Sequence, residues 1–183
     1  VIIGKDFYYD RYNRSDSSTY MTAGTMRVAG NFRQIITWVN SYNPFCPSGT
    51  HKVVLNGTKP QTVSFANGNS YFNNLEVQNS SGLILTESFR VNGTLTSTHD
   101  TVTTKSDGVK IYAMKLGTNL SVSGDVDVEY GPVMLQGYKL KVDGNLIHSG
   151  GTVQLNKGTL EVTGDYRLQQ KSTNSAGETV WES

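Results

Sequence analysis

The sequence has few charged residues, a single cysteine and no long apolar run. Charged residues make up 17% of the 183 residues, and the net charge of +1 gives no electrostatic reason to expect nucleic-acid binding. Cys46 has no second cysteine to pair with, so packing and hydrogen bonds must stabilise the fold. No apolar run approaches the ~18 residues of a membrane-spanning helix, and we expect no membrane span.

The sequence also lacks a recognisable signal peptide and wall anchor. Its low charge and abundant Gly, Thr, Asn, Ser and Val favour an all-β extracellular protein over a cytosolic helical one. We therefore expect an extracellular or cell-wall location. We also expect residues 1–183 to form a single domain that is a fragment or processed form of a longer repeat array.

A strand-like block recurs at one constant spacing in the C-terminal third of the chain. It reads NLSVSGDV at 119–126, KLKVDGNL at 139–146 and TLEVTGDY at 159–166. Each copy alternates apolar and polar residues and then reaches a glycine and an Asp or Asn, as a strand does when it enters a turn. A constant short period, here about 20 residues, is typical of repeat architectures.

Related segments lie near the N-terminus. Residues 1–7 match the block without a gap, and residues 19–32 align with residues 153–166 over fourteen positions of the same character. We interpret the chain as one long repeat and part of a second, with neither end resembling a cap. Residues 33–48 are the least regular part, where we favour a strand continuing into a loop over a short helix. Residues 96–110 are polar and predict a loop or insertion.

Two folds can use such strands: an antiparallel sandwich with a hairpin turn at Asn92-Gly93, and a parallel solenoid whose glycines mark corners. The constant spacing of Val122, Val142 and Val162 favours the solenoid, because each coil must stack on the coil below. We predict a right-handed parallel β-solenoid (β-helix) with coils of roughly 20 residues and loop insertions. These valines should form one interior column, and a second should contain Leu120, Leu140 and Leu160.

Four strings stand out between the irregular segments: SGTHKVVLNG at 48–57, QTVSF at 61–65, SYFNNLEV at 70–77 and NSSG at 79–82. Together they resemble a unit that recurs in large repetitive surface proteins, secreted or wall-associated, of Gram-positive, Clostridia-like bacteria. GTMRVAGNFRQ at 24–34 and GTLEVTGDYRLQ at 158–169 are similar to the other block of that family. The resemblance covers nearly the whole chain. It implies a β-repeat form, a surface location and an adhesive or scaffolding role, and it supplies no catalytic residues.

One phase of the repeat carries short oxygen-bearing side chains: Asp6, Asn31, Asp125, Asn145 and Asp165, with Thr94 at the related place. Such a column could bind calcium, or it could be a turn ladder in which each side chain bonds its own backbone or the next coil. A calcium-binding repeat would show Gly-Gly-x-Gly-x-Asp runs, which this chain lacks. We therefore predict a turn ladder, with no metal and no cofactor.

Catalytic signals are weak. His51, His99 and His148 are far apart, the chain has no Gly-x-Ser-x-Gly motif, and its acidic residues are dispersed or belong to the ladder. We predict that the protein is not an enzyme and has no catalytic residues. A polysaccharide-acting β-helix enzyme remains a third alternative.

The aromatic residues of the two irregular segments are the candidate ligand-binding residues: Tyr9, Tyr12, Trp38, Tyr42 and Phe45. Exposed rings can stack on sugars, and they can equally pack an insertion against the flank of the solenoid. We expect Trp38 to be mainly buried and Tyr42 to be the more exposed ring.

The function that these patterns favour is a structural or presenting segment of a bacterial cell-surface or secreted repeat protein. The alternative is an adhesin or glycan-binding module that uses the aromatic insertions. The expected partners are a cell-wall or host glycan, or another surface protein. Unpaired strand edges at either end would also permit end-to-end self-association.

Overall fold

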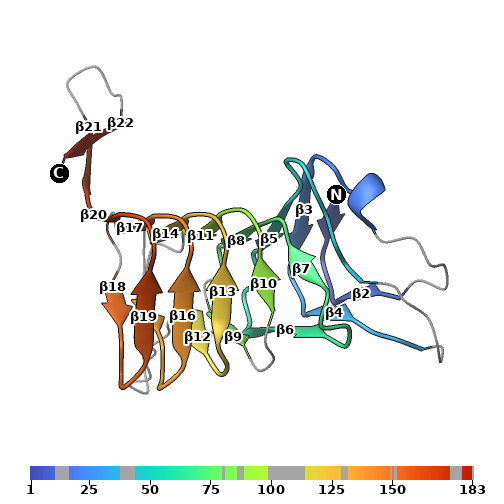
Figure 1. Cartoon of the computed structure of the whole chain (residues 1–183). Coiled ribbons are helices and arrows are strands. Elements are labelled where there is room, and N and C mark those ends of the chain that lie inside the picture. Colours follow the sequence, from blue (N-terminus) through green and yellow to red (C-terminus); the bar gives the residue numbers. More distant parts are fainter. Residues whose placement is uncertain are drawn as a thin grey trace.

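The computed structural model of the chain is a parallel β-solenoid of about 6 turns, with about 22 residues per coil (Figure 1). It describes residues 1–10, 17–37, 44–79, 81–85, 89–98, 114–128, 132–148, 150, 152–173 and 179–182. These residues include no α-helix, and therefore none long and apolar enough to cross a membrane. The predicted all-β parallel fold is confirmed.

Three parallel sheets form the sides of the solenoid. Sheet A has eight strands: β1 (Ile2–Ile3), β3 (Thr25–Val28), β5 (Lys52–Leu55), β8 (Asn74–Val77), β11 (Leu95–Ser97), β14 (Val126–Val128), β17 (Leu146–His148) and β20 (Tyr166–Leu168). Sheet B has seven: β2 (Phe7–Tyr9), β4 (Phe32–Gln34), β6 (Gln61–Phe65), β9 (Leu83–Leu85), β12 (Met114–Leu116), β15 (Pro132–Met134) and β18 (Thr152–Gln154). Sheet C has five: β7 (Tyr71–Phe72), β10 (Arg90–Val91), β13 (Leu120–Val122), β16 (Lys139–Val142) and β19 (Thr159–Val162).

Two smaller elements lie outside these sheets. A 3-10 helix, η1 (Ser17–Thr19), follows β2 and precedes β3, the first strand of the second coil. Strands β21 (Gln170–Thr173) and β22 (Thr179–Glu182) form an antiparallel hairpin that projects from the C-terminal end of the coil stack (Figure 1).

The register of sheet C is the one that the constant C-terminal period predicts. Strands β13, β16 and β19 pair in parallel, with Val122 opposite Val142 and Val142 opposite Val162. The leucines stack in the same way, in the order Leu120, Leu140, Leu160. Val122 and Val142 are fully buried, so the column is interior. The solenoid is therefore confirmed over the antiparallel sandwich.

The period is not constant along the chain. Within sheet A, Ile3 pairs with Val28 and Val28 with Leu55, so the first two steps are both longer than the C-terminal period. The next two steps, from Leu55 through Val77 to Ser97, shorten until they equal that period. The step from Ser97 to Val128 is the longest in this sheet because it contains the insertion after β11. The C-terminal period is thus the shortest sequence separation between paired residues of neighbouring strands in sheet A. Insertions lengthen this separation in the longer coils.

In the first two coils, the described residues form no strand on the side that sheet C forms elsewhere. Irregular backbone closes this side in the described part of residues 17–50. The carbonyl oxygen of Phe45 accepts a hydrogen bond from the Tyr71 amide of β7 at 2.8 Å, and the Phe45 amide donates to Ser70 Oγ at 3.0 Å. Met21 accepts from the Ser48 amide at 2.9 Å in the coil before. The preference for a strand followed by a loop after Phe32 is confirmed by β4, which ends at Gln34.

Similar sequences occupy different faces at the two ends of the chain. The alignment of residues 19–32 with 153–166 equates β3 of sheet A with β19 of sheet C, and β4 of sheet B with β20 of sheet A. A strand followed by glycine and Asp or Asn therefore marks a corner, but not which corner. Segments that the sequence matches as copies of one long repeat therefore lie on different sheets of the solenoid in the structure.

Candidate functional site

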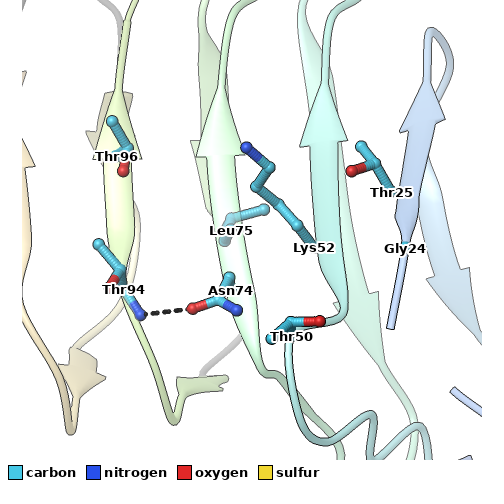
Figure 2. Close-up of a pocket in the computed structure, with 8 residues that line it drawn as sticks. All are labelled: Gly24, Thr25, Thr50, Lys52, Asn74, Leu75, Thr94 and Thr96. Atoms are coloured by element: carbon cyan, nitrogen blue, oxygen red, sulfur yellow. Dashed lines mark hydrogen bonds between the residues drawn. The ribbon is translucent and has the colours of Figure 1, made fainter. Parts of the chain in front are cut away.

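The outer face of sheet A carries a polar groove of about 480 Å³ that crosses β3, β5, β8 and β11 (Figure 2). Its lining combines hydroxyl groups, one amide and one ammonium group, from Gly24, Thr25, Thr50, Lys52, Asn74, Leu75, Thr94 and Thr96. Thr25, Lys52 and Asn74 share one register row across the first three of these strands. Alternation places their side chains outside, whereas Leu75 in β8 is a core residue.

Hydrogen bonds hold the central residues of the groove in place. Asn74 Oδ1 accepts from the Thr94 amide at 3.0 Å (Figure 2). Asn74 Nδ2 donates to the His51 carbonyl at 3.2 Å. The Lys52 ammonium forms an ion pair with Glu76 at 2.7 Å. These groups can donate to and accept from the hydroxyls of a neutral sugar. The lining contains no carboxylate pair for acid–base chemistry and no aromatic ring for stacking.

The predicted turn ladder is formed by hydrogen bonds between successive coils. Asp125 Oδ1 accepts from the Asn145 amide at 2.7 Å, and Asn145 Oδ1 accepts from the Asp165 amide at 2.9 Å. Asp6 Oδ1 accepts from the Asn31 amide at 2.7 Å, and Asn31 Oδ1 from the Thr62 amide at 2.9 Å. Each side chain thus reaches the next coil, as the ladder interpretation requires.

The ladder is in fact two separate ladders. Asp6 and Asn31 precede β2 and β4 of sheet B, whereas the three later residues precede β14, β17 and β20 of sheet A. They do not share one column, because the motif marks a different corner in each half. Asn74, which the sequence did not single out, belongs to the sheet A series through its bond to Thr94.

Close approach of the corners explains the glycine of the motif. A Cβ atom added to Gly144 would lie 2.5 Å from Asp125 Oδ1 and 2.6 Å from the carbonyl carbon of Gly124. Such distances are closer than non-bonded atoms tolerate, so a side chain here would force the coils apart. The glycine allows successive corners to lie close together, and the following Asp or Asn bonds one corner to the next.

Removing a ladder oxygen is expected to destabilise the stack modestly. Asn145→Ala deletes the acceptor of the Asp165 amide, and we expect the free energy of unfolding to fall by about 1 kcal/mol. Asn145→Asp retains an oxygen acceptor and is the matched control, with an expected change well below that. Urea unfolding followed by circular dichroism measures both variants. Equal stability of the alanine variant and the wild type would contradict the role of the ladder.

A second hollow of about 380 Å³ lies at the corner between sheets A and B in the first three coils. Asp6 lines it, and the amide of Asn31 that donates to the Asp6 carboxylate lowers the pKa of that group below its ordinary value of 3.8. Asn56 also lines it, with a buried Oδ1 for which the described residues provide no hydrogen-bond partner. In the described part of the chain, no three His, Cys, Asp or Glu residues lie close enough together to hold a metal ion.

The predicted ligand-binding aromatics are placed as follows. Phe45 is fully buried, and Tyr9 is 8% exposed. Both rings belong to the core, at 5.3 Å between centroids, so for them the packing alternative applies and neither offers a face to a sugar. Tyr12, Trp38 and Tyr42 lie outside the described residues, and the expected burial of Trp38 and exposure of Tyr42 stay predictions.

The two histidines that the structure describes lie in different coils. His51 is buried in the core region beside Phe45, with ring centroids 6.3 Å apart. His148 lies in β17, where its Nδ1 is 3.0 Å from the Tyr166 hydroxyl, and His99 lies outside the described residues. Burial lowers the pKa of His51 below its ordinary value of 6.5, and its Nδ1 has no hydrogen-bond partner among the residues that the structure describes.

The buried His51 predicts a loss of stability in mild acid. The folded state keeps His51 neutral at a pH where the unfolded chain, with a pKa near 6.5, already binds a proton. The free energy of unfolding should therefore fall as pH drops below about 6.5, until His51 also titrates in the folded state. Above that pH, His51 does not make the free energy of unfolding depend on pH.

The variant His51→Phe removes this proton linkage and should make the acid slope shallower. Urea midpoints measured between pH 8 and pH 5 compare the two proteins. Parallel profiles for the variant and the wild type would contradict the assignment to His51.

The groove was not predicted from the sequence. Its residues come from four coils of unequal length, so no fixed spacing connects Thr25, Lys52, Asn74 and Thr94. Polar residues at the outward positions of successive strands could have indicated the groove. These positions can be identified only when the register of the N-terminal coils is known. Comparisons of the chain with protein-family models, with curated proteins and with solved structures find no match.

Proposed function

We propose that the chain is a non-catalytic structural segment of a bacterial cell-surface or secreted repeat protein, where it holds another part of that protein at a distance. The observation that supports this role most strongly is the unbroken eight-strand parallel sheet A, which runs the length of the solenoid. Each coil bonds to its neighbours through backbone amides and carbonyls, and side chains add the corner ladders. We expect a stack of this kind to be stiff along its axis, because every coil except the first and the last is bonded to a coil on each side.

Limited proteolysis with a broad-specificity protease tests the structural role. We expect residues 120–168 to survive as one fragment, because the strands from β13 to β17 pair on both sides and β18, β19 and β20 pair with the coil before them. Mass spectrometry identifies the cuts. Rapid cleavage inside β13, β14 or β16 would contradict a rigid segment. A reducing-sugar assay on pectins and xylans tests the polysaccharide-acting alternative, and release of sugar ends would overturn the non-catalytic assignment.

A glycan-binding role is the second candidate, and the groove of Figure 2 is the observation that favours it. Its hydroxyl, amide and ammonium groups suit a neutral or weakly acidic glycan. A glycan array with the wild-type chain should then give hits that weaken in Lys52→Ala. The control is Lys115→Ala, since Lys115 is exposed on the outer face of sheet B. Hits that weaken only in Tyr42→Ala would move the site to the insertion that contains this residue.

A further inference from the structure

The two ends of the solenoid differ. At the N-terminal end strands form two sides, β1 and β2, while residues 17–24 lie on the third side and Met21 packs against the core. At the C-terminal end strands form all three sides, β18, β19 and β20. Each of these three is the last strand of its sheet, so its outer edge has no neighbouring strand in the part of the chain that the structure describes.

The core is open at this C-terminal end. Leu155, Tyr166 and Leu168 are 48%, 53% and 66% exposed. By contrast Leu146, which precedes Tyr166 in the same column one coil earlier, is fully buried. Three more core residues of the last coil are only half-buried: Val153, Leu160 and Val162. Free strand edges around an exposed apolar patch are the features of an interface.

The C-terminal hairpin does not cover this surface. It projects from the corner after β20, clear of β18 and β19 (Figure 1).

We propose that this end binds the same end of a second copy of the chain, in a two-fold symmetric dimer. The N-terminal end is a poor partner, because its described residues include no strand on the third side that could meet β19. A second C-terminal end has strands on all three sides. A two-fold axis reverses the strand direction between copies, so β19 of each copy pairs antiparallel with β20 of the other.

Charge and apolar pattern agree on one register for this pairing. Glu161 of β19 and Arg167 of β20 both lie in outward rows, since they pair with Lys141 and Ile147 of the preceding coil. Placing Glu161 opposite Arg167 of the other copy gives two ion pairs across the dimer. The same register places the core residues opposite one another, Leu160 with Leu168 and Val162 with Tyr166.

The present partners of the two charged residues do not oppose this arrangement. Glu161 pairs with Lys139 at 3.0 Å, and Arg167 pairs with Asp165 at 2.8 Å. All four side chains are 45% exposed or more. Ion pairs this exposed contribute little, so exchanging them for contacts across the dimer costs little.

Sedimentation equilibrium of the full chain over a concentration series tests the proposal. We expect a monomer–dimer equilibrium for the wild type. Arg167→Glu places like charges across the dimer and should raise the dissociation constant more than about tenfold. Glu161→Arg should do the same, and the double variant Glu161→Arg/Arg167→Glu should restore the dimer. Lys115→Glu, an exposed charge change away from the end, should leave the equilibrium unchanged.

Leu168→Asp provides a second readout, since Leu168 is exposed in the single chain and its loss should abolish the dimer without lowering the melting temperature of the monomer. Three results would overturn the proposal. They are a monomer at millimolar concentration, a dimer that neither Arg167→Glu nor Leu168→Asp weakens, and open-ended polymers, which indicate head-to-tail stacking. None of these results bears on the structural role, which the protease experiment tests separately.

Discussion

Val142→Asp is expected to unfold the C-terminal coils. Val142 is fully buried in sheet C, between Val122 of the preceding coil and Val162 of the following coil. A carboxylate at this position would find no partner in an apolar column, and leaving one buried charge uncompensated costs about 3–5 kcal/mol. Since small folded domains are stable by about 5–15 kcal/mol, this loss is a large part of the total.

Hydrogen exchange and thermal unfolding by circular dichroism measure the effect. The amides of β13, β16 and β19 should lose protection first, because a solenoid coil depends on its immediate neighbours. Lys141→Asp changes the adjacent residue, which faces outward, and is the matched control with a small expected effect. A Val142→Asp protein that melts with the wild type would show that residue 142 is not in the core.

Phe45→Ala is expected to cause the second large loss of stability. Its fully buried ring lies in a cluster of aromatic rings, with centroids 5.0 Å from Phe32 and 5.9 Å from Phe72. It also occupies the side of the early coils where the described residues form no strand of sheet C. Truncation would leave a cavity that hydrogen-bonded backbone on both sides cannot close, and such changes cost about 3–5 kcal/mol.

The ring of Tyr8 provides the control for this prediction. Tyr8 is 55% exposed on β2, and Tyr8→Ala should change the free energy of unfolding by less than about 1 kcal/mol. Urea unfolding of both variants gives the comparison. If Phe45→Ala were as stable as Tyr8→Ala, the irregular segment would not be part of the core, and a ligand-binding role for Phe45 would again be open.

The C-terminal half of the fold could be predicted because its coils carry no large insertion between β14 and β20. There every coil has the same three strands, so Leu140 and Val142 recur at a constant distance from their neighbours. Strand alternation inside a fixed longer period can satisfy only one stacking register without turning apolar residues outward. The sequence therefore determines both the parallel pairing and the interior columns in this region.

The N-terminal half could not be assigned in the same way. Its coils are longer and unequal, as the steps from Ile3 to Val28 and from Val28 to Leu55 show, so the stacking partner of a residue cannot be found by counting. Phe45 shows the consequence: it lies in an irregular segment with aromatic neighbours, a composition that fits an exposed binding loop as well as a core plug. The backbone hydrogen bond between Phe45 and Tyr71 fixes the core position, and this long-range contact is not encoded by any local sequence pattern.

The corner motif illustrates a further limit. Glycine followed by Asp or Asn reports that two corners stack closely, as Gly144 and Asp125 do. It carries no information on which two sheets the corner joins, because the local geometry is similar at each corner. For this reason Asp6 and Asp125 looked equivalent in the sequence and lie at different corners in the structure.

Two engineered disulfides test the parallel register in solution, each in a Cys46→Ser background. The pairs are Ser121→Cys with Lys141→Cys, and Asp127→Cys with Ile147→Cys, which occupy neighbouring strands in the structure. Parallel neighbours lie about 4.8 Å apart, within the Cα separation that a disulfide spans. Both pairs have the same separation along the sequence. An antiparallel arrangement could bring together one pair at most, since its paired residue numbers have a constant sum.

Mass spectrometry of free thiols after mild oxidation gives the readout, with Ser121→Cys/Glu161→Cys as the negative control. Those two positions are two strands apart, roughly 9.6 Å, which is beyond the reach of a disulfide. A parallel solenoid predicts that both neighbouring pairs form disulfides and that the control pair stays reduced. Formation of only one neighbouring pair, or of the control pair, would contradict the stacked parallel coils.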